Sequence, residues 1–97
     1  MNKEITKPVI HLNGTAAETL LEDNIEARRT IEDAISRIQK MEFNGRDYYP
    51  VAGSFEKARD ERMAILTNLR DASDYFLAIA EHCSEVVAER EARKAGR

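Results

Sequence analysis

The sequence is poor in the residues that build disulfides, metal sites and large aromatic cores. It has one cysteine, two prolines, four glycines, six aromatic residues and no tryptophan among 97 residues. The single Cys83 excludes a disulfide within the chain and is typical of a reducing compartment. No apolar run approaches the roughly 18 residues of a membrane span, and residues 1–4 lack the apolar core of a signal peptide. We therefore expect a cytoplasmic protein without a membrane anchor.

Size and charge exclude further classes of function. The net charge of −3 argues against general nucleic-acid binding and against adhesion to an anionic membrane surface. Ninety-seven residues are enough for one domain, and we expect residues 1–97 to form a single one. A chain this short buries only a modest fraction of its surface, so association with a further copy of itself would stabilise it.

Two segments have the periodicity of helices. The first helix is predicted over residues 15–42, opening on a capping box of Thr15 and Glu18 and stopped by Gly45 in the left-handed conformation. The second is predicted over residues 55–92, with Ser54 as its N-cap. Each helix has one apolar stripe at spacings near 3.6 residues. The stripes comprise Leu21, Ile25, Ile31, Ile35 and Ile38 in the first helix, and Phe55, Ala58, Ile65, Leu66, Leu69, Phe76, Ile79, Ala80, Cys83, Val86 and Val87 in the second.

These elements predict an all-α fold. The connecting loop, residues 43–54, is short enough to require an antiparallel hairpin of two long helices. Two helices with one apolar stripe each cannot enclose a core, so the hairpin is predicted to assemble into a homo-oligomeric helical bundle, a homodimer or larger. The second helix should overhang the first from about residue 82. Residues 1–14 are predicted to be an extended arm whose apolar run, residues 9–12, lies along the bundle.

The sequence contains no residue pattern typical of a catalytic or a metal-binding site. His82 precedes Cys83 directly, and adjacent helical residues diverge by about 100°, so the two side chains do not face each other. Cys83 lies on the apolar stripe and is interpreted as a core residue, and His82 as a solvated helix residue. No cysteine pair and no paired Glu-x-x-His pattern is present. We therefore expect no enzyme activity, no metal and no cofactor.

Candidate ligand-binding residues gather around the connecting loop. Arg46 could hold a phosphate, and Tyr48 or Tyr49 could stack against a base. Arg59 and Arg62 fall in the first turns of the second helix, whose N-terminus favours anions. In the alternative interpretation, a tyrosine plugs the open end of the bundle and the arginines snorkel or pair with nearby carboxylates.

Two further candidates lie away from the loop. Arg28 sits on the apolar stripe of the first helix, where it could face a cavity between helices or pair with a carboxylate such as Glu32. Asn13 belongs to a glycine-containing turn before the first helix, where free backbone N–H groups could receive an anion. Entry into the helix alone also explains that turn.

Two motifs carry a resemblance to a known family. His11-Leu12-Asn13-Gly14-Thr15 before the first helix, and Asn44-Gly45-Arg46-Asp47-Tyr48-Tyr49-Pro50 between the helices, resemble a family of small tailed-phage and prophage proteins without an established activity. The resemblance covers roughly residues 9–87 and depends on these motifs, because the helices are generic. Val51-Ala52 replaces the Gln-Gly pair that is common in the family. The resemblance implies a bacterial cytoplasmic setting and supplies no catalytic residue.

Together these patterns predict a non-catalytic phage accessory protein that sequesters a small phosphorylated, nucleotide-like ligand. Small phage proteins frequently counter bacterial defence, and some capture nucleotide immune signals in oligomer pockets, so the function is drawn by analogy. The alternative is a protein-interaction module, for instance an inhibitor of a host defence complex, that binds no small ligand.

Overall fold

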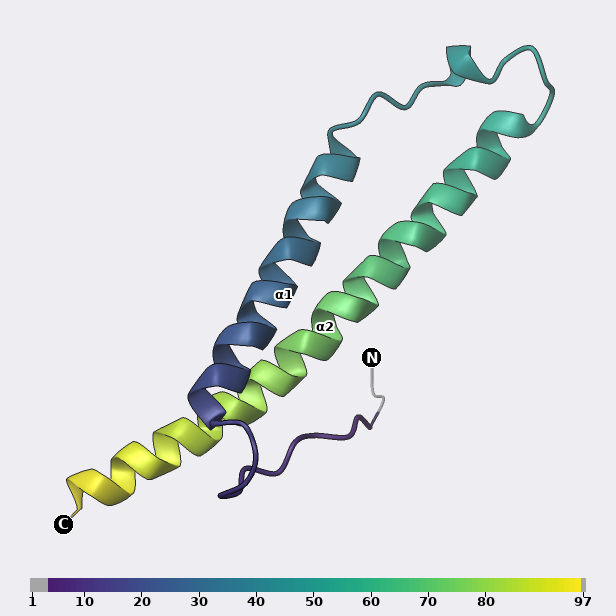
Figure 1. Ribbon diagram of the computed structural model, residues 1–97. Coiled ribbons are helices and arrows are strands. Elements are labelled where there is room, and N and C mark those ends of the chain that lie inside the picture. Colours follow the sequence, from purple (N-terminus) through teal and green to yellow (C-terminus); the bar gives the residue numbers. More distant parts are fainter. Residues whose placement is uncertain (1–3, 97) are drawn as a thin grey trace.

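The computed structural model describes residues 4–96, which form two long α-helices and a short 3₁₀ helix (Figure 1). Helix α1 spans Ala17–Gln39, the 3₁₀ helix η1 spans Gly45–Asp47, and helix α2 spans Ser54–Ala95. The described part of the chain has no strand. The long helices lie side by side and antiparallel, in a molecule measuring 71 × 24 × 22 Å. The predicted all-α antiparallel hairpin is confirmed. Neither described helix contains a stretch apolar enough to cross a membrane.

The two helices meet along a seam with alternating spacings of three and four residues. This spacing keeps one line of side chains directed at the partner helix over the whole length of contact. Every seam residue is buried or half-buried. The seam consists of Ala17, Leu21, Asn24, Arg28, Ile31, Ile35 and Ile38 of α1, and of Arg62, Leu66, Leu69, Ser73, Phe76, Ala80, Cys83 and Val87 of α2.

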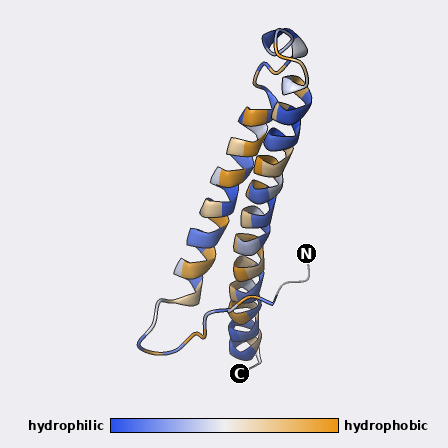
Figure 2. Cartoon of the chain, turned by 90° about the vertical axis from the view of Figure 1, so that its right-hand side faces the viewer, coloured by the Kyte–Doolittle hydropathy of each residue, from blue (hydrophilic) through white to orange (hydrophobic). Residues whose placement is uncertain are grey.

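The hairpin encloses only a small core. Among the described residues, the buried apolar side chains are Ala17, Ile35, Leu66, Ile79, Ala80 and Cys83. Hydrophobic residues lie mainly toward the line between the helices and hydrophilic ones outside (Figure 2). The accessible surface is 7637 Å², against about 5,600 Å² for a compact monomer of this mass. One chain therefore leaves much of its surface uncovered.

Helix α1 is shorter than predicted at both ends. Its N-cap is Ala16 and no side chain caps it, so the predicted capping box of Thr15 and Glu18 is wrong. The amide of Gly14 donates to the His11 carbonyl over 3.1 Å, and Ala16 then adopts an extended conformation with ψ 144°. This turn delays the start of the helix until after Thr15. At the other end, the Lys40 amide closes the last turn on the carbonyls of residues 36 and 37.

The loop between the helices turns at a different glycine from the one predicted. Gly45 starts η1 without a positive φ, whereas Gly53 has φ 78° and is the N-cap of α2. The left-handed conformation has little steric cost for glycine alone, so Gly53 reverses the chain into the helix. Ser54 is consequently the first helical residue, not the N-cap, and its hydroxyl donates to the Tyr48 carbonyl over 2.9 Å.

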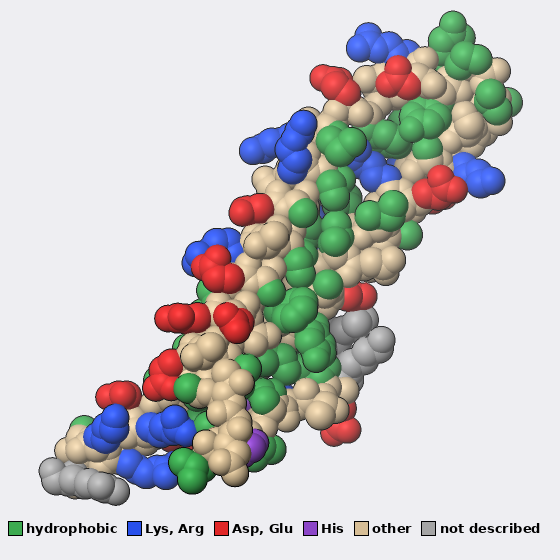
Figure 3. All heavy atoms as spheres, in the orientation of Figure 1, with side chains coloured by type: hydrophobic (Ala, Val, Ile, Leu, Met, Phe, Trp, Pro, Cys, Tyr) green, Lys and Arg blue, Asp and Glu red, His purple; other side chains and the backbone are tan. Residues whose placement is uncertain are grey.

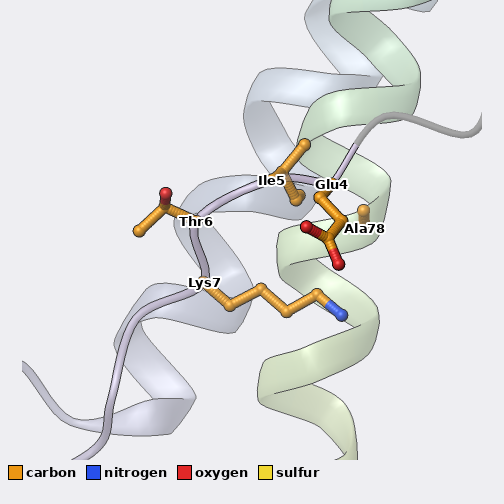
Figure 4. Close-up of a pocket in the computed structure, with 5 residues that line it drawn as sticks. All are labelled: Glu4, Ile5, Thr6, Lys7 and Ala78. Carbon is orange, nitrogen blue, oxygen red and sulfur yellow. The ribbon is translucent and has the colours of Figure 1, made fainter.

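The N-terminal arm lies along α2, as expected. His82 Nε2 is 2.8 Å from the carbonyl oxygen of Pro8, which fixes the arm to the helix. Nearer its start, the arm passes beside Ala78 and borders a shallow pocket there (Figure 4). The prediction of a solvated His82 is wrong, because the arm half-buries this side chain. The apolar run is split, with Ile10 half-buried and Val9 exposed.

The overhang of α2 is shorter than predicted. Helix α2 extends beyond the start of α1 (Figure 1), but the arm contacts it at His82. Farther along, the Arg90 guanidinium lies 3.9 Å from the Glu18 carboxylate in the first turn of α1. Contacts thus reach two turns past residue 82, and α2 continues to Ala95 rather than residue 92.

Cys83 is confirmed as a core residue. Its side chain is 0% exposed, and burial raises the pKa of its thiol. Since the thiolate is the reactive form, we expect an aromatic disulfide reagent to label Cys83 about 100-fold more slowly than in the unfolded chain, through local opening only. Absorbance of the released thiol measures this rate, with exposed Ser84→Cys in a Cys83→Ala background as control. Equal rates for Cys83 and the control would contradict the buried position.

Candidate functional site at the connector end

Three aromatic rings pack together where the chain leaves α1 and enters α2. The centroids of Phe43 and Phe55 are 5.2 Å apart in a stacked arrangement. Tyr48 lies edge-on to Phe43 at 5.8 Å and 6.0 Å from Phe55. Such pairs contribute about 0.5–1.5 kcal/mol each beyond the area they bury. Tyr48 thus helps to close this end of the hairpin, as in the alternative interpretation of the sequence.

Arg62 connects this aromatic cluster to the end of α1. Its guanidinium lies 4.9 Å from the centroid of the Phe43 ring. One of its terminal nitrogens, Nη2, donates to the Ile38 carbonyl over 2.7 Å. The last carbonyls of a helix have no partner within the helix, and a cation there also interacts well with the helix dipole. Arg62 therefore holds the two helices together at this end.

A groove of about 360 Å³ opens beside the cluster. Phe43 and Tyr48 form part of its wall, and Arg62 contributes the positive charge. Glu61 also lines it and places a carboxylate close to that charge. The remaining lining residues are apolar, namely Ile38, Met41, Ala58 and Ile65. The groove consequently suits an apolar or aromatic group better than a highly charged one.

The other predicted residues of this region point outward. Arg46 is exposed, and Tyr49 is 79% exposed. Arg59 is exposed, with its Nε 3.6 Å from the carboxylate of Asp60. None of these three lines the groove beside Arg62. The structure therefore brings only Tyr48 and Arg62 of the predicted site into one groove.

Arg28 and Asn13 lie elsewhere. Arg28 is half-buried in the middle of the seam, with Nη2 3.5 Å from the Glu32 carboxylate. Glu32 also accepts a 3.0 Å hydrogen bond from the buried hydroxyl of Ser73. Asn13 is exposed in the turn before α1, at the end of the hairpin opposite the connector (Figure 1). The seven predicted residues are thus distributed over three separate places. Within residues 4–96, no cluster of three potential metal ligands is present.

A second apolar line runs beside the seam, and its α1 part was not predicted. In both helices the position directly beside the seam recurs every seven residues and is apolar each time. We call this line of residues the apolar flank. It consists of Leu20, Ala27, Ala34 and Met41 of α1, and of Ala58, Ile65, Ala72, Ile79 and Val86 of α2. Helices that run antiparallel bring their equivalent flanks to the same face, and Met41 and Ile65 indeed line one groove. Figure 3 shows hydrophobic side chains along this line between the helices. In α2, four of these residues already belonged to the predicted stripe. The α1 residues and Ala72 did not, although their seven-residue period is visible in the sequence.

The opposite flank of the seam has a different character. Five of its eight residues are polar or charged. It consists of Glu18, Ile25, Glu32 and Gln39 of α1, and of Met63, Arg70, Leu77 and Ser84 of α2. Ile25, Glu32 and Leu77 line one groove on that side. The two faces of the hairpin therefore differ, and only one is apolar throughout.

Comparison with protein families, curated proteins and solved structures found no match to this chain. The resemblance to tailed-phage proteins and the phage origin therefore stay predictions.

Proposed function

We propose that the protein is a non-catalytic protein-interaction module whose working form is a homodimeric helical bundle. The observation that supports this proposal is the apolar flank, which runs along both helices on one face. Met41 and Ile65 on this flank are 51% and 55% exposed. Elsewhere on the flank Ala34 is exposed, Ile79 is buried and the other residues are half-buried. An exposed apolar patch such as the one around Met41 and Ile65 is typical of a protein–protein interface. In the phage setting that the resemblance implies, the assembled bundle would bind and inhibit a host protein.

The shape of one chain supports the dimer. The radius of gyration is 19.8 Å, against about 12.5 Å for a compact domain of this length. By the usual scaling of surface with mass, two chains merging into one compact body would bury about 3,000 Å² each. Even a third of that area exceeds the roughly 800 Å² per partner of a standard interface. The hairpin thus has ample surface for a stable dimer.

Light scattering during gel filtration tests this proposal. The wild type is expected to have twice the chain mass of 11.0 kDa. Ile65→Glu places a charge in the apolar interface and should weaken the dimer at least 100-fold, because a buried unpaired charge is costly. Met63→Glu is the matched control, since Met63 is 59% exposed on the opposite flank of the same helix. A monomeric wild type at 100 μM, or equal effects of the two variants, would contradict the proposal.

A nucleotide-like ligand is the second candidate. The groove at the connector favours it, because aromatic rings and the guanidinium of Arg62 meet there and Arg46 stands exposed in the loop. We expect AMP to bind in calorimetry with its base in the groove and its phosphate outside it, toward the exposed Arg46. Arg46→Ala should then weaken binding about tenfold by removing a phosphate contact. The melting temperature should not change, since Arg46 is exposed. An absence of heat at millimolar AMP, or unchanged affinity in the variant, would remove this candidate.

A further inference from the structure

Along each helix, the large and small side chains of the apolar flank follow nearly the same order from the N-terminal end as from the C-terminal end. In α1, large residues at the ends, Leu20 and Met41, enclose the small Ala27 and Ala34. In α2, the exposed Ile65 and the buried Ile79 are placed symmetrically about Ala72. A surface that packs on a copy of itself about a two-fold axis must be self-complementary in this way. The small residues at the centre allow the helices to approach closely.

The two centres of symmetry lie at the same height along the hairpin. The centre in α1 falls between Ala27 and Ala34, and that in α2 falls at Ala72. The hydrogen bond between Ser73 and Glu32 joins these levels directly. One axis perpendicular to both helices therefore passes through both centres to within about one helical turn. Nothing in the sequence of either helix alone requires this agreement.

We infer that two copies pack flank to flank in opposite directions about this axis, with α1 over the partner's α1 and α2 over the partner's α2. A second copy of this chain thus occupies the part of the apolar flank that the N-terminal arm leaves open, and the inference rests on the proposed self-association. Ala27 then faces the partner subunit's Ala34, and Ala72 faces the partner subunit's Ala72. The connectors of the two copies lie at opposite ends of the bundle.

The charges on α1 support the opposite directions. Glu18, Glu22, Asp23 and Glu26 precede Arg28, and no basic residue stands among them. The second half has Arg28, Arg29 and Arg37 against Glu32 and Asp33. Figure 3 shows the acidic side chains toward the start of α1 and basic ones toward its end. Packing in opposite directions places the acidic half of each α1 over the basic half of the other, and charge complementarity fixes register.

The N-terminal arm favours the same orientation. It occupies α2 beside Ala78, His82 and Val86, at one end of the hairpin only. The groove lined by Met41 and Ile65 stays open at the other end. With opposite directions, the arm end of each copy lies beside the open groove of the other. Equal directions would crowd both arms together and leave both grooves open.

Spin-label distances test the orientation separately from the dimer itself. The label is placed at exposed Val51 in the connector, as Val51→Cys in a Cys83→Ala background. Position 51 is 21 residues from Ala72, where the proposed axis crosses α2. At the rise of about 1.5 Å per helical residue, opposite directions place each label about 30 Å from the axis and the two labels about 60 Å apart. A dimer with labels closer than about 30 Å would overturn the inferred packing and leave self-association intact. A monomer in light scattering would overturn both.

Charge reversal gives an independent measurement. Asp23 and Arg37 stand beside the flank, one turn outward from Ala27 and Ala34, and opposite directions bring Asp23 next to the partner subunit's Arg37. Asp23→Arg or Arg37→Asp alone should weaken the dimer about three- to fivefold, as expected for a rim pair. The double variant should restore the wild-type affinity. Additive losses in the double variant would overturn this register.

Discussion

Phe43→Ala is expected to lower the free energy of unfolding by about 3 kcal/mol. The ring stacks on Phe55, contacts Tyr48 edge-on and lies under the guanidinium of Arg62. Truncation removes all three contacts together and leaves a gap at the connector end. Urea unfolding followed by circular dichroism, at one fixed protein concentration, measures the difference.

Tyr49→Ala is the matched control for this measurement. The Tyr49 ring is 79% exposed and belongs to the same loop, and surface truncations usually change stability by less than about 0.5 kcal/mol. If Phe43→Ala and Tyr49→Ala had equal effects, the aromatic cluster would not be closing the hairpin. A large loss for Phe43 alone supports the interpretation of Tyr48 and its neighbours as a plug.

The arrangement of the helices could be predicted from the sequence, and their ends could not. The apolar stripes have a helical period, and glycines and a proline separate them. Two helices joined by a loop that reverses the chain direction therefore follow directly. Helix ends depend on a single residue's backbone conformation. Gly45 and Gly53 are equally able to adopt a positive φ, and of the two only Gly53 does so. Thr15 failed as a cap because the turn at Gly14 displaced the helix start.

The candidate site was harder to predict than the fold for a related reason. From the sequence alone, an arginine near an aromatic loop is equally compatible with binding a phosphate and with stabilising the fold by contacting a backbone carbonyl. Only the structure shows that Arg62 donates to the Ile38 carbonyl, 24 residues away in sequence. His82 was similarly taken for a solvated residue, since its partner, the carbonyl of Pro8, is 74 residues distant. Such long-range backbone contacts have no signature in composition or spacing.

Dilution is expected to destabilise the fold strongly. The hairpin has few buried apolar side chains, and helices depend mainly on the packing of their apolar faces for stability. If the dimer interface supplies much of that packing, dimer dissociation and unfolding are coupled. The midpoint of thermal unfolding should then fall by about 10 °C between 100 μM and 0.1 μM protein, given the usual unfolding entropy per residue. Circular dichroism at 222 nm follows the transition.

A covalent link between the two copies distinguishes the coupling of dissociation to unfolding from other effects of dilution. Ala72→Cys in a Cys83→Ala background places one thiol on each side of the inferred axis, where a short bis-maleimide can join them. The linked dimer unfolds as one molecule, so its midpoint should be the same at every concentration. The same variant without the linker should still lose stability on dilution. An unlinked protein whose midpoint is independent of concentration would show that the single hairpin is stable by itself, and that the apolar flank contributes nothing to folding.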